Sequence, residues 1–583
     1  MFSGAPGGLA LPGGLALVLL CLAVYLPGLA QIPPVDRDES RFAQASRQMF
    51  QAAALPADAP ERALHPDFYT GGWAIPKHQD RDRLNKPPLI YWLQVASAWV
   101  FTSGRPALDA MWMYRLPSAL CATAAVLVTW RLGRRLFDPR VGLAAAALLA
   151  IAPMVVWDAH QARADQLLLL CTTAAMAALW PIWRDAAADD ARPRGWLAPL
   201  LLWLAIAAGV LAKGPVTLMV VALAAISLAA LTRRWRFLWH LRPGLGLAIL
   251  TITIGPWVYA VAQHVGGLGL YAQTVFNEFF ARGLRGSNEG HFAPPGTHML
   301  LLAALFWPGS IFTLAAVIRA VGRARGPGRW RDPWRGRDAE LFLLAWIVPS
   351  WILFELSLAK LPHYTLPLYP AVALLSARTL LELGGRLPDL GQRLGAGIRW
   401  LIGVTLAVVS LAVVTRATWA DSGPASLWPV AWIIIASGLM AGAAWFLTRR
   451  WLPIRATLLA SAAWIGTVAL GLSIALPGWS PIWVTPRLAK IAGDFGPLAA
   501  VGFAEDSLIF ATRGRAERLT IADIPAFAAR PGALRRAIVA ADADRSAWPA
   551  HTVLGRAEGH NYANGQAVDV IVIEFAPSAG DTP

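Results

Sequence analysis

Two charged motifs carry the residue types best suited to chemistry in this chain. The first, Asp38-Glu39-Ser40-Arg41-Phe42, holds two neighbouring acids, and the second, Lys86-Pro87-Pro88, closes the same charged segment with a lysine. A carboxylate can take a proton from a hydroxyl group, and a lysine ammonium suits a phosphate as a point-charge partner. Acids followed by a lysine beside a membrane therefore suit a reaction between a lipid-borne anionic donor and a neutral nucleophile.

Asp38 is the candidate general base, and Glu39 is the second acid of the first motif. A carboxylate near a low-dielectric surface can have a raised pKa, which suits proton abstraction. The spacing of apolar and polar residues over 40–50 predicts an amphipathic helix that lies on the membrane. Both acids then have an alternative role, as caps and dipole partners of the helix N-terminus.

Two more candidates lie at the ends of apolar runs. Asp165 leads directly into one such run, where an ionisable group is costly and usually pairs or functions. Asp165 is therefore expected either to have a role in the chemistry or to form a structural ion pair with Arg163. Arg282 follows the aromatic residues of segment 276–282, which indicates either a site for a lipid phosphate and its prenyl chain or a plain interfacial helix.

The chain has only five lysines, whereas arginine serves the other basic positions. Lys86, Lys213 and Lys360 fall at loops or turns on one side of the predicted membrane body, and His363 and Tyr364 follow Lys360 directly. We expect Lys86, Lys213 and His363 to bind a donor phosphate, and Tyr364 adds a polar side chain at the same turn. The alternatives are that helix-end lysines only extend to the interface and that the tyrosine belongs to an aromatic belt.

The composition is that of an integral membrane protein. The 583 residues are 56% hydrophobic, include 28 Trp, and carry only 15% charged residues. Apolar runs long enough to span a bilayer recur until about residue 476. The three cysteines lie within such runs and lack metal-binding spacing, so neither a zinc site nor a disulfide framework is expected.

The charge of the chain is unevenly distributed. Segments 233–242, 319–338 and 449–455 are rich in arginine, whereas 36–86 and 484–583 balance basic with acidic residues. Short arginine-rich loops mark the cytoplasmic side of a membrane protein, so the balanced segments belong on the opposite side. The formal charge of +16 therefore reflects the arginine-rich loops on one side of the membrane. Nucleic acid is not an expected partner, because no soluble segment has a basic patch with interleaved aromatics.

These patterns predict a mainly α-helical, polytopic membrane protein with about thirteen spans. The N-terminus is expected in the cytoplasm, and a transmembrane domain over 1–480 includes outer loops at 31–117, with interfacial helices, and at 263–297. Residues 88–102 are short for a span and are expected to be interfacial or re-entrant. A small α/β domain over 484–583 is expected on the periplasmic side, with strands near 500–503, 537–540 and 569–574.

The motifs, taken in order, resemble the bacterial arm of the protein O-mannosyltransferase superfamily, and in particular the lipid A aminoarabinose transferase family. The motifs that carry the resemblance are Asp38-Glu39-Ser40-Arg41-Phe42-Ala43, Pro76, Lys86-Pro87-Pro88-Leu89-Ile90-Tyr91-Trp92, Arg163-Ala164-Asp165, Lys213-Gly214-Pro215 and Lys360-Leu361-Pro362-His363-Tyr364. The resemblance covers about residues 9–382, and Gly559-His560-Asn561-Tyr562 is a weaker match near the C-terminus.

The resemblance implies a GT-C fold, a bacterial inner-membrane location, and an undecaprenyl-phosphate-linked sugar as donor. It also implies Asp38 as the base, Asp165 as a second acid, and Lys86, Arg282 and Tyr364 as phosphate-binding residues. The chain departs from the family pattern at Asn85, where an acid is expected, and in the longer stretch 51–83. No certain cofactor follows, and a divalent metal ion is a candidate that Asn85 weakens.

The predicted function is an inverting glycosyltransferase that moves a sugar from the lipid-phosphate donor to an envelope acceptor, with lipid A as the first choice. The sequence leaves open a related enzyme that acts on another glycan or on protein, as the O-mannosyltransferases do. A membrane transporter is the alternative of another class, but transporters show inverted repeats and polar breaks near the middle of the membrane. The expected partners are the lipid-linked sugar, a lipid or glycan acceptor, and membrane lipids.

Overall fold

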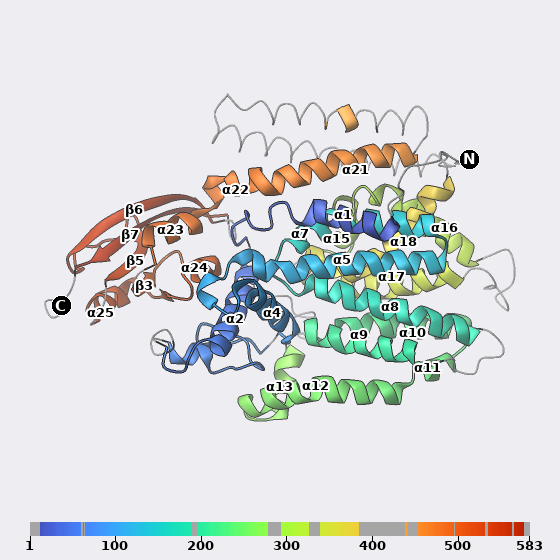
Figure 1. Cartoon of the computed structure of the whole chain (residues 1–583), viewed down its shortest axis with the longest axis horizontal. Coiled ribbons are helices and arrows are strands. Elements are labelled where there is room, and N and C mark those ends of the chain that lie inside the picture. Colours follow the sequence, from blue (N-terminus) through green and yellow to red (C-terminus); the bar gives the residue numbers. More distant parts are fainter. Residues whose placement is uncertain are drawn as a thin grey trace.

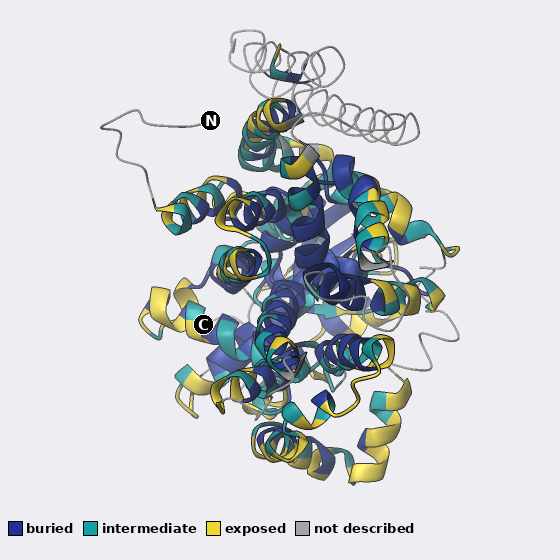
Figure 2. Cartoon of the chain, turned by 90° about the vertical axis from the view of Figure 1, so that its right-hand side faces the viewer, coloured by how far each residue is buried: buried dark blue, intermediate teal, exposed yellow. Residues whose placement is uncertain are grey.

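The computed structural model is mainly helical. It describes residues 12–576 except for 36, 60–61, 63–64, 85, 188–194, 278–292, 326–337, 384–435, 437, 441–442, 444–452, 495, 531–533 and 562–564. Long helices run side by side through most of the molecule, and a β-sheet lies at one end of them (Figure 1). Buried residues gather along the middle of this helical body, and exposed ones lie on its outer helices (Figure 2).

Several helices have the length and composition of membrane spans. Within the described residues, five helices pass this test, and a sixth span results if α6 and α7, bent by 59° to one another, are counted together. The helices concerned are α5 (Met111–Leu136), α6 (Pro139–Ala150), α7 (Pro153–Ala159), α8 (Asp165–Ala187), α12 (Pro243–Val265), α17 (Asp338–Leu356), and α21 (Pro453–Leu470), which continues through η5 (Gly471–Ala475) and α22 (Leu476–Gly478). The chain is therefore a multi-pass membrane protein.

The remaining helices of the body are shorter. They are α1 (Gly13–Tyr25), α9 (Leu197–Lys213), α10 (Val216–Thr232), α11 (Phe237–His240), α13 (Leu268–Phe276), α15 (Thr297–Leu305), α16 (Ser310–Arg325), η4 (Pro362–Leu368) and α18 (Tyr369–Leu383). The apolar runs near 141–157, 244–262 and 456–476 of the sequence form helices. Two further apolar runs, near 398–415 and 427–447, lie wholly or mostly outside the described residues.

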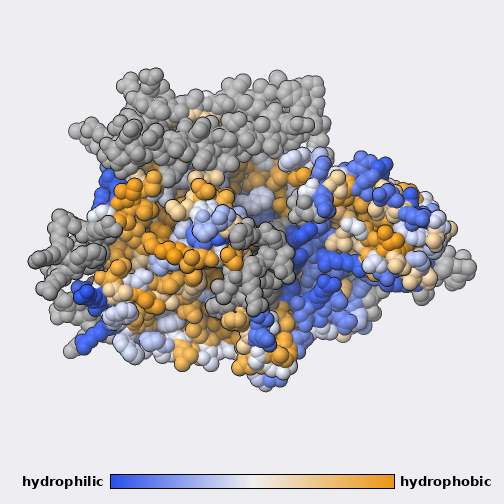
Figure 3. All heavy atoms as spheres, turned by 180° about the vertical axis from the view of Figure 1, so that it is seen from behind, coloured by the Kyte–Doolittle hydropathy of each residue, from blue (hydrophilic) through white to orange (hydrophobic). Residues whose placement is uncertain are grey.

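Small residues let the helices of the body approach closely. A Cβ atom on Gly133 of α5 would lie 2.7 Å from the Cα atom of Gly142 on α6, so only glycine fits at this crossing. Apolar residues gather on the surface of the helical body, whereas hydrophilic residues gather where it meets the sheet-bearing end (Figure 3). This distribution is the one expected for a body embedded in lipid.

The segment between α1 and α5 forms a compact unit beside the sheet. It contains α2 (Arg37–Ala54), η1 (Pro66–Tyr69), the hairpin β1 (Lys77–His78) and β2 (Arg81–Asp82), α4 (Leu89–Thr102) and η2 (Pro106–Leu108). The α4 helix matches the short apolar run 88–102 and has 14 residues, fewer than the roughly 20 that a span needs.

The helix predicted over 40–50 is present, but its polar face is not exposed as expected. Gln44, Arg47 and Gln48 are buried. The cause is tertiary: α2 packs on α4 with its apolar side and is covered on its polar side by α24 (Asp506–Ala511), more than 450 residues later in the chain. Arg47 donates hydrogen bonds to Asp109 Oδ2 (2.6 Å) and to the Phe510 carbonyl (2.6 Å).

The C-terminal region is a five-stranded mixed sheet with the strand order β4-β3-β5-β7-β6. Its elements are α23 (Val484–Ala492), β3 (Leu498–Ala500), α24, β4 (Ala516–Arg518), η7 (Ile521–Asp523), α25 (Ile524–Ala528), β5 (Arg535–Ala540), β6 (His551–His560) and β7 (Ala567–Phe575). The strands predicted at 537–540 and 569–574 are found within β5 and β7. The strand predicted at 500–503 is present as β3, but β3 begins two residues earlier and ends three residues earlier than predicted, so the two ranges share only Ala500.

Candidate active site

Asp38 lies in the first turn of α2, and its side chain keeps 39% of its surface exposed. Four cations surround it: Arg163, Lys86, Arg83 and Arg41. Partial burial alone would raise the pKa of Asp38, but these positive charges outweigh it and hold the pKa below its ordinary value of 3.8. The expectation of a raised pKa was therefore wrong. Asp38 is ionised at neutral pH and is a reachable proton acceptor.

Asp165, the first residue of α8, is buried and forms the centre of a second cluster. Its Oδ1 atom accepts a hydrogen bond from Lys213 Nζ and lies 3.7 Å from His363 Nε2. Its Oδ2 atom lies 3.5 Å from Arg163 Nε. Arg163 also places Nη2 at 3.2 Å from His363 Nε2. Three of the predicted site residues, far apart in the sequence, therefore meet here, and the Arg163 ion pair weighed as an alternative is present as well.

Local chain geometry explains why these residues meet. Lys213 ends α9, and Gly214 has a positive φ of 68° that turns the chain sharply before Pro215 and α10. His363 lies in η4, which packs against the start of α8. Burial and the adjacent cations Arg163 and Lys213 hold the pKa of His363 well below 6.5, against the opposing effect of Asp165. His363 is therefore a neutral imidazole at neutral pH.

Arg163 links the two clusters, because its charge acts on Asp38 as well as on Asp165. The sequence suggested this arginine only as an ion-pair partner. Arg83 was missed altogether. It donates a hydrogen bond from Nε to the Tyr91 hydroxyl (3.1 Å) and lies over the Phe42 ring at 5.1 Å. The sequence could have indicated Arg83 as a site residue, because it lies in the same charged loop as Lys86.

Glu39 lies next to Asp38 but has an entirely different environment. It is fully buried, and Arg115 donates to both of its oxygens, from Nε at 2.7 Å and from Nη2 at 2.9 Å. The backbone amides of Val35 and Ala162 donate to the same carboxylate at 3.0 and 2.9 Å. Each oxygen thus accepts two hydrogen bonds, so contact with a substrate does not fit this geometry. Glu39 joins α2, α5 and the loop before α8.

Tyr364 lies beside His363 in η4, and its ring centre is 5.2 Å from that of His363 and 6.4 Å from that of His298. Lys360 donates to the carbonyls of Ala293 (2.9 Å) and Ser357 (2.5 Å), so it fixes the loop that carries η4. Arg282 lies outside the described residues, and so does Asn85.

The longer stretch 51–83 contacts the C-terminal region. Gln79 donates to the carbonyls of Gly514 (3.2 Å) and Ala516 (2.7 Å), and His78 Nε2 lies 3.4 Å from Asp506 Oδ1. Arg41 donates to Asp506 Oδ2 at 2.6 Å, only three residues after Asp38. The sheet-bearing region therefore helps to position the helix that carries the candidate base.

The described residues offer no ready metal site: among them, no three His, Cys, Asp or Glu side chains gather in a way that could hold a metal ion. The groups nearest Asp38 and Asp165 are cations, which suit an anionic ligand. A partly exposed carboxylate set among several cations can place a phosphate next to a proton acceptor.

Comparison with known proteins finds matches to glycosyltransferases. Residues 85–259 match the family described as dolichyl-phosphate-mannose-protein mannosyltransferase. An undecaprenyl phosphate-α-4-amino-4-deoxy-L-arabinose arabinosyl transferase of Edwardsiella ictaluri is 27% identical over 411 residues, which are 70% of this chain and 65% of the relative. The corresponding transferase of Pseudomonas aeruginosa PAO1 is 27% identical over 376 residues, 64% of this chain and 60% of the relative. The sequence matches thus span less than two thirds of the length of either relative.

The crystal structure of ArnT from Cupriavidus metallidurans bound to undecaprenyl phosphate superposes with a TM-score of 0.67 at 19% identity, and covers 97% of this chain and 99% of that one. The resemblance seen in the motifs is confirmed. The chain is similar in sequence to the aminoarabinose transferases, and it has the GT-C fold of ArnT. The superposition extends over the C-terminal sheet as well as the helical body.

Proposed function

We propose that this protein is a membrane glycosyltransferase that moves a sugar, aminoarabinose or a close relative, from undecaprenyl phosphate to lipid A. The observation that carries the proposal is the group of four cations around Asp38, which joins the Asp165 cluster through Arg163. The similarity to the arabinosyl transferases supports the choice of sugar and of lipid carrier.

The proposed reaction is a single displacement with inversion. An acceptor oxygen attacks the anomeric carbon of the sugar, and the bond from that carbon to the phosphate oxygen breaks. The electron pair leaves with undecaprenyl phosphate, whose developing charge is neutralised by Lys86, Arg163 and Arg83. Asp38 takes the proton of the acceptor hydroxyl. Asp165 keeps Lys213 and Arg163 in place, which makes it a positioning residue in this scheme.

A transfer assay with undecaprenyl-phosphate-linked aminoarabinose, purified full-length protein and lipid A tests the proposal directly. The expected result is lipid A heavier by one sugar residue, detected by mass spectrometry, and free undecaprenyl phosphate in equal amount. Transfer to another glycan or to a peptide, with lipid A unchanged, would move the protein to the alternative acceptor class. Movement of the intact lipid-linked sugar across vesicles without cleavage would instead indicate a transporter.

We further propose about thirteen spans, with the N-terminus in the cytoplasm, a transmembrane domain over 1–480, and a periplasmic domain over 484–583. The support is the charge asymmetry: Arg131, Arg134 and Arg135 end α5, whereas Asp165 and Lys213 lie at the other end of the bundle. Reporter fusions at residues 330 and 500 should report opposite compartments. Matching compartments would reject this topology and leave the chemistry untouched.

A further inference from the structure

A cavity of about 670 Å³ lies between α5, α8 and α9, with α11 at its edge. It is far from the candidate active site: Asp165 begins α8 and Lys213 ends α9, whereas the cavity is lined by the last half of α8 and the first half of α9. Its size is within the range of small-ligand sites, about 300–1,000 Å³. No step of the proposed reaction uses this cavity.

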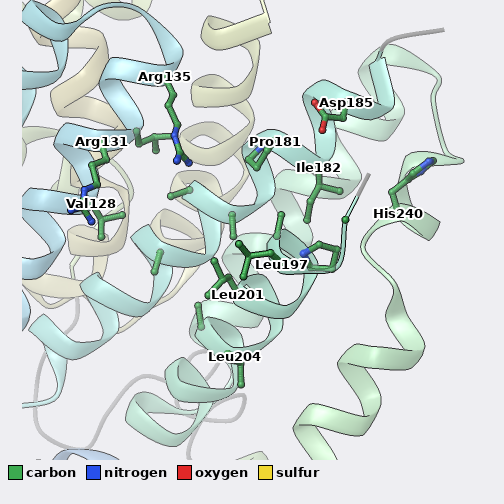
Figure 4. Close-up of a pocket in the computed structure, with 18 residues that line it drawn as sticks. Val128, Arg131, Arg135, Pro181, Ile182, Asp185, Leu197, Leu201, Leu204 and His240 are labelled. Atoms are coloured by element: carbon green, nitrogen blue, oxygen red, sulfur yellow. The ribbon is translucent and has the colours of Figure 1, made fainter. Parts of the chain in front are cut away.

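The walls of the cavity are apolar. Val128 of α5, Ala177 and Ile182 of α8, and Leu201 and Leu204 of α9 face it (Figure 4). The lining of α8 runs from Ala174 to Asp185, eleven residues apart, or about 16 Å of helix axis. One leaflet of a bilayer has a hydrocarbon depth of roughly 15 Å, half of about 30 Å. The cavity therefore has the depth of a chain that ends within one leaflet.

The mouth of the cavity is basic. Arg131 and Arg135 lie one helical turn apart near the end of α5, and His240 lies on the opposite side of the cavity (Figure 4). Both arginines are exposed, and neither forms an ion pair within the described part of the chain. The nearby acid, Asp185, lies 3.5 Å from its neighbour Arg184. A single anionic group at the bilayer surface would complement this pair.

We propose that the cavity holds one acyl chain of an anionic diacyl phospholipid, with the lipid phosphate between Arg131 and Arg135. Apolar walls take the chain, and the arginines take the phosphate with charge-assisted hydrogen bonds. The leaflet-deep shape favours a fatty-acyl chain over the much longer prenyl chain of the donor. Such a lipid stabilises the packing of α5 against α8, whose opposite ends carry Arg115 and Asp165.

The test uses delipidated full-length protein in detergent, titrated with phosphatidylglycerol or with phosphatidylcholine of the same acyl chains, and native mass spectrometry counts the bound lipid. We expect one tightly bound phosphatidylglycerol molecule. The affinity for phosphatidylcholine should be at least about tenfold lower, because a basic side chain near the surface contributes about 1 kcal/mol per charge. Arg131→Gln with Arg135→Gln should remove this preference. The matched double variant Arg140→Gln with Arg236→Gln changes two exposed arginines that do not line the cavity, and it should keep the preference.

Filling the cavity gives an independent measurement. Ala177→Phe should weaken binding of both lipids, and Ala205→Phe, on the facing helix, serves if the first variant does not fold. Phosphatidylglycerol should also raise the melting temperature of the wild type, and not that of the Arg131→Gln/Arg135→Gln variant. Equal retention of both lipids, or unchanged phosphatidylglycerol binding in the cavity variants, would overturn the proposal. Displacement of the bound phosphatidylglycerol by undecaprenyl phosphate would overturn it too.

Discussion

Asp38 and Glu39 are neighbours in the sequence, yet the structure gives them opposite environments. Glu39 is closed: one arginine and two backbone amides occupy both of its oxygens, and no surface is left for a ligand. Asp38 is more open: it keeps more than a third of its side-chain surface and lies among the cations Arg163, Lys86, Arg83 and Arg41. A fully buried carboxylate held by one arginine and two backbone amides stabilises the fold, whereas a partly exposed carboxylate among cations can contact a substrate.

The same contrast separates Glu39 from Asp165. Asp165 is also buried, but its partners Lys213, Arg163 and His363 come from three different parts of the chain. An anionic group entering beside Asp165 would compete for the cations Lys213 and Arg163, whereas Arg115 also donates to the carbonyls of Leu29, Ile32 and Pro33.

The largest expected effect is that of Asp38→Asn. The change keeps the shape of the side chain and removes its basicity, and such losses cost about 10²–10⁴-fold in rate. We expect kcat for sugar transfer to fall by that factor, with a melting temperature close to that of the wild type. Asp80→Asn, which changes an exposed acid of the same segment between α1 and α5, is the control for loss of one charge.

Two outcomes would contradict the assignment of Asp38. If Asp38→Asn keeps most of its activity and Asp165→Asn abolishes it, the base is Asp165. If neither variant loses activity with a hydroxyl acceptor, the reaction needs no carboxylate base.

Glu39→Gln should act on stability. The glutamine cannot accept both guanidinium hydrogen bonds and the two amide bonds, so Arg115 stays buried with an uncompensated charge. Breaking a buried pair by removing one partner costs about 3–5 kcal/mol. We expect a lower melting temperature and a smaller folded yield, but near-normal kcat for the molecules that remain folded, with the exposed Glu558→Gln as control. Normal stability combined with lost turnover would show that Glu39 touches the substrate.

Lys86→Ala should have a smaller effect on transfer. If Lys86 is one of several cations that neutralise the leaving phosphate, its removal should lower kcat/KM by at least about tenfold, roughly 1.4 kcal/mol, without loss of folding. Lys490→Ala, an exposed lysine of α23, is the matched control. Near-normal transfer by Lys86→Ala would mean that this lysine only reaches to the interface.

The sequence predicted the helical membrane body and most of the candidate site, because both depend on local signals. Long apolar runs specify spanning helices, and the motifs around Asp38, Asp165, Lys213 and His363 each lie at the end of an element.

The difference between Asp38 and Glu39 was not predictable, since it depends on Arg115, 76 residues away. The burial of the polar face of α2 depends on Arg41–Asp506 and Arg47–Phe510 contacts across more than 460 residues. Strand β6 was missed because most of its residues are exposed, and its less exposed positions from 555 to 559 are Gly555, Ala557 and Gly559, which give no strong apolar signal.

The smallest expected effect is on the pH dependence of stability, and it differs between the buried His363 and the partly exposed Asp38. His363 has a folded pKa well below its ordinary 6.5, because it is buried beside Arg163 and Lys213. Below pH 6.5 the unfolded chain therefore binds a proton that the folded chain refuses, so stability falls as pH falls, by at most about 1.4 kcal/mol per pH unit for this group. His78, with a pKa of about 4, and His298 act in the same direction. The lowered pKa of Asp38 adds a further loss of stability only below pH 3.8.

We therefore expect the melting temperature of the wild type to fall between pH 7.5 and 5.5, and that of His363→Gln to fall less. Over the same range the charges of Asp38 and His363 do not change, so kcat of the folded enzyme should stay nearly constant. An equal fall in both proteins would show that the pKa of His363 is not lowered by folding, and a smaller fall in the wild type would show that His363 is protonated in the folded state, as the ion-pair partner of Asp165.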